Sequence, residues 1–115
     1  MIQQLLDKYS YAAIQSGNEL YFPLSVAIEI VSDCTVSGLV VAGVEFFHIA
    51  EGKITPVVAP LNGLDCSDVL EEQKEWSLLI KQCNSAAISV LEFEAERDDS
   101  QYVNLTVLSH DDMPV

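Results

Sequence analysis

The longest apolar stretch of the chain spans residues 39–58, LVVAGVEFFHIAEGKITPVV, and its pattern predicts a β-hairpin. Its first half is rich in β-branched and aromatic residues, the types enriched in strands. Strict alternation would place Val40, Ala42, Val44 and Phe46 on one face and Leu39, Val41, Phe47 and Ile49 on the other. Both faces are apolar, so we expect this strand to be buried on both sides. Gly52 favours a turn at residues 50–53, and Pro56 predicts that the returning strand is an edge strand or ends early.

Helical spacing dominates the chain before the hairpin. The spacing of the first apolar stripe predicts a helix over residues 2–13, with Gly17 just after its end. Residues 19–22 are expected to be a connector, and Pro23 suits the first turn of a second helix. We expect that helix to end near residues 34–38 and to bury a stripe of Leu24, Ala27, Ile28 and Val31.

A loop over residues 60–65 and a third helix are predicted after the hairpin. Asn62-Gly63 is a strong turn signal, and Asp65 or Ser67 is a suitable cap for the helix that follows. At helical spacing, one face of this helix carries Val69, Trp76, Leu79, Ile80 and Cys83, and an adjacent face carries Asp68, Glu71, Glu72 and Glu75.

Residues 84–97 fit two structures. A helix would begin at Asn84 as N-cap and place Ala87, Val90, Leu91 and Glu94 on one side, whereas a strand would alternate Leu91, Phe93 and Ala95 against three glutamates. The Ala and Glu content favours the helix. Residues 102–108 are predicted to form a strand that pairs with the hairpin and faces the core with Val103, Leu105 and Val107. The tail from His110 onward is expected to be frayed.

These elements predict a single α+β domain over residues 1–115. Its small antiparallel sheet would contain the hairpin 39–58 and a strand near 101–108, covered by three or four helices. A length of 115 residues is usual for one domain, and a hydrophobic content of 50% supports a sizeable core. The apolar run is too interrupted for a membrane span, and the first ten residues do not resemble a secretory signal. With three widely spaced cysteines expected as free thiols, we predict a cytoplasmic protein.

The charge narrows the range of partners. Eighteen acidic residues against five basic ones give a net charge of −13, in a chain too hydrophobic to be disordered. A strongly negative surface repels nucleic acids and anionic membranes and attracts cationic surfaces. Residues 1–64 carry six acids and two bases (net −4), and residues 65–115 carry twelve acids and three bases (net −9). We therefore expect a basic protein to bind the second half.

The chain contains no recognisable catalytic or cofactor motif. It has two histidines, no zinc-ligand spacing and no glycine-rich phosphate loop. His48 lies in the apolar strand, where a structural role is expected, and the acid pairs are too common to specify acid–base chemistry. We therefore predict a protein that is not an enzyme and holds neither metal nor cofactor. Its predicted partner-binding residues are Asp68, Glu71, Glu72, Glu75, Glu92, Glu94, Glu96, Asp98, Asp99 and Tyr102.

Three segments together carry a family resemblance: QQLLDKY near the start, VAGVEFFHIAEGKI in the hairpin, and EEQKEW in the acidic helix. In this pattern the chain resembles the immunity proteins of bacterial polymorphic-toxin and contact-dependent-inhibition systems. The resemblance implies a cognate toxin, often a cationic nuclease, that is bound tightly and blocked by occlusion. Three alternatives stay open: a structural or adaptor module that homodimerises through apolar surface, an inhibitor that mimics nucleic acid, and an enzyme using His48 with a nearby carboxylate.

Overall fold

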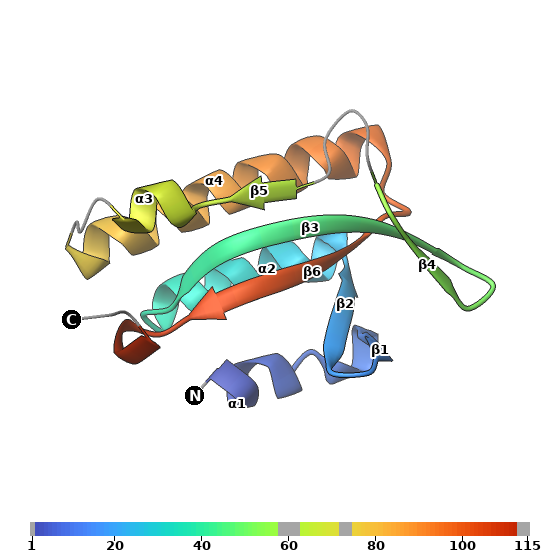
Figure 1. Ribbon diagram of the computed structural model, residues 1–115, viewed down its shortest axis with the longest axis horizontal. Helices are drawn as coiled ribbons and strands as arrows, with labels where there is room; N and C mark the ends of the chain where they lie inside the picture. Colours follow the sequence, from blue (N-terminus) through green and yellow to red (C-terminus); the bar gives the residue numbers. More distant parts are fainter. Residues whose placement is uncertain (1, 58–62, 72–74, 113–115) are drawn as a thin grey trace.

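The computed structural model describes residues 2–57, 63–71 and 75–112. It is an α+β fold in which helices pack on an antiparallel sheet, as predicted (Figure 1). In chain order the elements are α1 (Ile2–Asp7), η1 (Ser10–Ala12), β1 (Ile14–Ser16), β2 (Glu19–Pro23), α2 (Leu24–Val36), β3 (Val40–Ala50), β4 (Lys53–Pro56), β5 (Gly63–Asp65), α3 (Ser67–Glu71), α4 (Trp76–Arg97), β6 (Tyr102–Leu108) and η2 (His110–Asp112).

The sheet is organised around β3. Its strand order is β1-β2-β6-β3-β4, and β5 pairs with β3 on the same edge as β4. The hairpin β3–β4 and its pairing with β6 confirm the predicted strands. Glu51 and Gly52 form the hairpin turn, both with positive φ, and β4 is an edge strand that ends at Pro56. The predicted effect of this proline on the strand is therefore confirmed.

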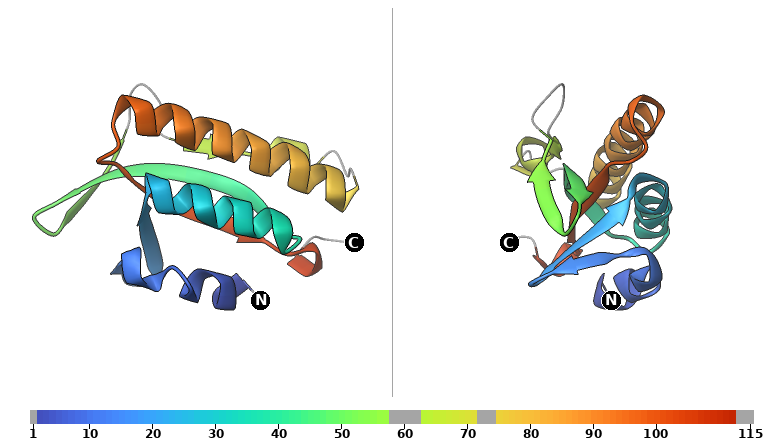
Figure 2. Two further views of the ribbon diagram at one scale, coloured as in Figure 1. Left: turned by 180° about the vertical axis from the view of Figure 1, so that it is seen from behind. Right: turned by 90° about the vertical axis from the view of Figure 1, so that its right-hand side faces the viewer.

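Two antiparallel helices, α2 and α4, cover one side of the sheet (Figure 2). The main core lies between them and the strands, and it includes Phe22, Leu24, Ile30, Val44, Phe46, Leu91 and Val103. A second apolar cluster, formed by Val40, Cys66, Leu79 and Cys83, joins α3 and the start of α4 to β3. The alternate residues Val103, Leu105 and Val107 of β6 belong to or pack against the main core, as predicted.

A β-bulge corrects the predicted faces of β3. The register with β6 shifts between Val41 and Gly43, so one additional residue enters β3 at this point. An extra residue reverses the side to which later side chains point. Val41 consequently shares the main core with Val44 and Phe46, whereas Val40 belongs to the second cluster. Burial on both sides is confirmed for the start of β3, where Val40 and Val41 are both buried, while Glu45 and His48 are exposed.

The N-terminal region differs from its prediction. The first helix ends at Asp7, since the chain then turns and the Tyr9 hydroxyl donates a hydrogen bond to Asp33 of α2. The acceptor carboxylate also lies 3.3 Å from the Lys8 ammonium. Residues 19–22 belong to β2 and are not a connector, and Gly17 (φ 59°) lies in the β1–β2 turn instead of ending a helix. Gly17-Asn18 is a two-residue hairpin signal that helical spacing obscured.

The third and fourth predicted segments are also rearranged. Helix α3 is short, and α4 is one helix of 22 residues that includes both residues 76–83 and the ambiguous segment 84–97. Asn84 is therefore not an N-cap but a buried residue within α4. Asp65 does accept a hydrogen bond from the Ser67 amide at the start of α3, as predicted (2.9 Å). Part of the predicted loop 60–65 is β5, although residues 60–62 lie outside the described residues.

Candidate functional site

Apart from Asp65, the described carboxylates of the second half that are exposed or half-buried lie near the two ends of α4. Asp68, Glu71 and Glu75 lie at its N-terminal end and are called here the N-terminal acidic group. Glu92, Glu96, Asp98 and Asp99 lie at its other end and are called the C-terminal acidic group. Glu75 precedes Glu92 by 17 residues, which corresponds to about 26 Å along α4 at a rise of about 1.5 Å per residue. The predicted binding residues therefore form two surfaces instead of one.

The N-terminal acidic group gains carboxylates from the end of the chain. His110 stacks on the Trp76 ring with centroids 4.9 Å apart and an interplanar angle of 16°. This contact holds η2 beside the start of α4, so the exposed Asp111 and Asp112 lie near that end of the helix. Residues 110–112 thus form a 3₁₀ helix where a frayed tail was predicted, and residues 113–115 lie outside the described residues. Glu72, another predicted binding residue, lies outside the described residues.

The C-terminal acidic group contains both helical and turn residues. Glu92 and Glu96 are exposed one turn apart on α4, and Asp99 is exposed in the turn that follows. Asp98 is half-buried and accepts hydrogen bonds from the Ser100 hydroxyl (2.6 Å) and amide (3.1 Å). These bonds lower the pKa of Asp98, and the charge of nearby His48 contributes less to the same effect.

Glu94 is not part of this surface, although it was predicted to bind the partner. Its side chain is 0% exposed and lies 2.6 Å from the Arg97 guanidinium. Gln101, itself buried, donates a second hydrogen bond to it (3.2 Å). The Arg97 hydrogen bond lowers the pKa of Glu94 in spite of its burial. Since Glu94 and Arg97 neutralise each other, the arginine contributes little to offset the exposed acids around it.

The aromatic residues of the predicted surface are engaged within the fold. The Trp76 indole nitrogen donates to the Gly38 carbonyl (2.8 Å), and the ring packs against the second cluster as well as His110. This agrees with the expected position of Trp76 on the apolar stripe. Tyr102 is half-buried at the start of β6, opposite Pro23 and Phe47 in the register. Its ring is therefore less accessible than the sequence suggested.

An aromatic that sequence reasoning missed stands on the outer side of α4. Phe93 is 61% exposed and lies next to Glu92 and three residues before Glu96. The strand alternative for residues 84–97 placed Phe93 in the core. In a helix it lies off the buried stripe of Ala87, Leu91 and Glu94. The helical periodicity of residues 84–97 is therefore the sequence signal from which the exposure of Phe93 could have been predicted.

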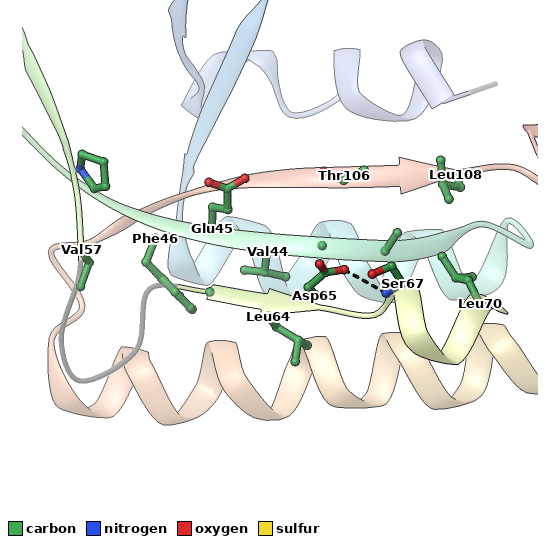
Figure 3. Close-up of a pocket in the computed structure, with 14 residues that line it drawn as sticks. Val44, Glu45, Phe46, Val57, Leu64, Asp65, Ser67, Leu70, Thr106 and Leu108 are labelled. Atoms are coloured by element: carbon green, nitrogen blue, oxygen red, sulfur yellow. Dashed lines mark hydrogen bonds between the residues drawn. The ribbon is translucent and has the colours of Figure 1, made fainter. Parts of the chain in front are cut away.

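A groove of about 550 Å³ lies on another part of the molecule, over β3, β5 and β6 (Figure 3). Glu45 and Asp65 supply its carboxylates, and Leu64, Leu70 and Leu108 are among its apolar lining residues. The hydrogen bond from Ser67 holds Asp65 in place and lowers its pKa. The lining described includes no histidine, cysteine or lysine, so its residues offer no nucleophile–base pair of the Cys–His or Ser–His kind.

The described histidines and thiols are not among the residues that line this groove. His48 is exposed on β3, and Cys34, Cys66 and Cys83 are buried free thiols. Burial raises the pKa of the Cys34 thiol to about 12, which suppresses its thiolate form. Within the described ranges, no group of three or more His, Cys, Asp and Glu is placed to hold a metal ion. None of the described helices has the length and apolar character needed to cross a membrane.

Comparison of the chain with protein-family models, with curated proteins and with solved structures finds no match.

Proposed function

We propose that this chain is a non-enzymatic immunity protein that binds and neutralises a cognate cationic toxin domain through its acidic surface. One observation carries the proposal: among the described residues, every carboxylate other than that of Glu94 is wholly or partly exposed. The net charge of −13 is thus presented at the surface of a packed α+β domain. Such a surface accelerates encounter with a basic partner and discriminates against acidic ones.

The few basic residues do little to neutralise this surface. Lys8 lies 3.3 Å from Asp33, and Arg97 is paired with the buried Glu94. Exposed carboxylates are therefore left in large excess at both ends of α4. In the proposed mechanism exposed carboxylates of this chain occupy the positions of substrate phosphates in the basic groove of a toxin, such as a nuclease. The toxin is then blocked both sterically and electrostatically.

The same charge disfavours the homodimer alternative. Val36 is 88% exposed and β4 is a free edge strand, and both are features that self-association uses. Two copies, however, would bring together surfaces that each carry a net charge of −13. An oppositely charged partner gains from this field, whereas a second copy must overcome it. Action in the cytoplasm is part of the proposal, and three buried free thiols support a reducing compartment.

Capture followed by a toxicity assay tests this function. The tagged chain is expressed in its source cells, and proteins retained at low salt and at high salt are identified. We expect one protein of net positive charge in stoichiometric amount. That protein should arrest growth when it is expressed alone, and co-expression of this chain should restore growth. A captured protein that is harmless, or an arrest that co-expression does not relieve, would contradict the proposal.

A further inference from the structure

Phe93 is unusual on α4 because its ring points away from the protein. The helix buries Leu79, Cys83, Ala87 and Leu91 on its inner side, while 61% of Phe93 is exposed. A single exposed apolar residue is common and has no meaning by itself. What distinguishes Phe93 is the set of charges around it.

Glu92 and Glu96 flank Phe93 on the exposed side of α4. They lie at positions i and i+4, where two like charges destabilise a helix by a few tenths of a kcal/mol. The nearest base in the sequence is Arg97, and it is held by Glu94. A cation brought to this surface would relieve the repulsion, and an anion would increase it. The surroundings of Phe93 are therefore complementary to a positively charged partner.

The other large apolar residue that is exposed on α4 has different surroundings. Leu78, 50% exposed on the same helix, lines a shallow depression with Lys81, Gln82 and Ser85. At the N-terminal end of α4, Trp76 is held by Gly38 and His110. Within the described part of α4, an exposed aromatic ring and exposed carboxylates coincide at the C-terminal end. This arrangement is typical of a binding centre in which an aromatic anchor is surrounded by polar contacts.

We infer that Phe93 is the anchor by which a cationic protein docks on α4, with Glu92 and Glu96 pairing with its lysines or arginines. The inference rests on the proposed function and identifies which of the two acidic groups performs it. The Phe93 ring enters an apolar depression on the partner, and the two glutamates contact the basic rim of that depression. Glu75 of the N-terminal acidic group lies about 27 Å from Phe93 along α4, so that group contributes to the long-range field instead of the contact.

Site-specific photocrosslinking tests this inference on the whole chain in its source cells. The photoreactive residue p-benzoylphenylalanine replaces Phe93, Glu71 or Tyr11 in three separate variants. Tyr11 is the matched control because it is an aromatic that is 77% exposed and lies in η1. Circular dichroism confirms that each variant is folded. We expect an adduct from position 93 with a protein of net positive charge, identified by mass spectrometry, and none from position 11.

The other outcomes separate this inference from the proposed function. An adduct from position 71 alone would overturn the inference but leave a cationic partner in place. No adduct from position 93 or 71, or an adduct with an acidic protein, would overturn both. With the crosslinked partner purified, Phe93→Ser should weaken its affinity about thirtyfold, the effect of losing a central anchor. Tyr11→Ser should change the affinity less than twofold, and equal losses for the two variants would also contradict the inference.

Discussion

Each side of α4 carries two exceptions to the usual distribution of polar and apolar residues. The inner side buries Asn84 and Glu94, and both have hydrogen-bond partners within the fold. The outer side exposes Leu78 and Phe93. Buried polar groups are tolerated when they are hydrogen-bonded, so the inner side is explained by the fold alone. Folding does not explain why Phe93 is exposed between Glu92 and Glu96. We therefore infer that the outer side of α4 is the side that binds a partner.

The largest effect on stability is expected at Asn84. Its side-chain oxygen accepts from the Val41 amide (2.8 Å), and its nitrogen donates to the Leu39 carbonyl (3.0 Å). Asn84→Leu keeps the size but leaves both buried backbone groups without these partners. We expect a loss of about 3 kcal/mol in the free energy of unfolding, measured by urea titration. The outward-facing Ser85→Ala should change it by less than about 0.5 kcal/mol. Equal losses of unfolding free energy in the two variants would show that the inner and outer sides of α4 do not differ in this way.

A smaller effect, dependent on pH, is expected from Glu94. The hydrogen bond from Arg97 lowers the pKa of Glu94 below its usual value of 4.5. Near that value the unfolded chain binds more protons than the folded one, so stability rises with pH. The contribution of Glu94 is complete above pH 4.5 and is lost as pH falls through the lowered pKa. In Glu94→Gln, stability should therefore fall less steeply on acidification below pH 4.5 than in the wild type, as urea titrations at several pH values would measure. Glu96→Gln, which removes one exposed charge, is the control. If the free energy of unfolding of Glu94→Gln depended on pH as in the wild type, the role assigned to the Glu94–Arg97 pair would be contradicted.

The smallest effect on stability is expected at Phe93, although its effect on binding should be large. The exposed ring leaves little apolar contact to lose, so Phe93→Ser should change the free energy of unfolding by less than about 0.5 kcal/mol. The inward Leu91→Ala, two positions earlier, should cost about 3 kcal/mol because it empties space in the main core. A cost for Phe93→Ser similar to that for Leu91→Ala would mean that Phe93 is structural and not an anchor.

The same exceptions limited what the sequence could predict. A continuous apolar run identified β3, alternation identified β6, and helical spacing identified α2, because each pattern is typical of its element. Over residues 84–97, the exposed Phe93 and the buried Glu94 weaken the helical pattern, which left a strand alternative open. The bulge in β3 and the pairing of β5 depend on contacts with distant residues. The aspartates and glutamates were visible as a charge excess. Only the fold shows that Glu94 is internal and that the other described acids of the predicted binding set lie near the two ends of α4.

The most direct test of the central claim is the association rate of the captured cationic protein with two charge-reversal variants. Glu92→Lys/Glu96→Lys and Asp68→Lys/Glu71→Lys each remove two negative charges and add two positive ones, so their net charges are equal. Stopped-flow association is measured at low and at high salt. We predict that the α4 variant slows association about tenfold at low salt, that the α3 variant slows it about twofold, and that high salt reduces both effects. Equal slowing would show that only net charge matters, and greater slowing by the α3 variant would place the contact at the N-terminal acidic group.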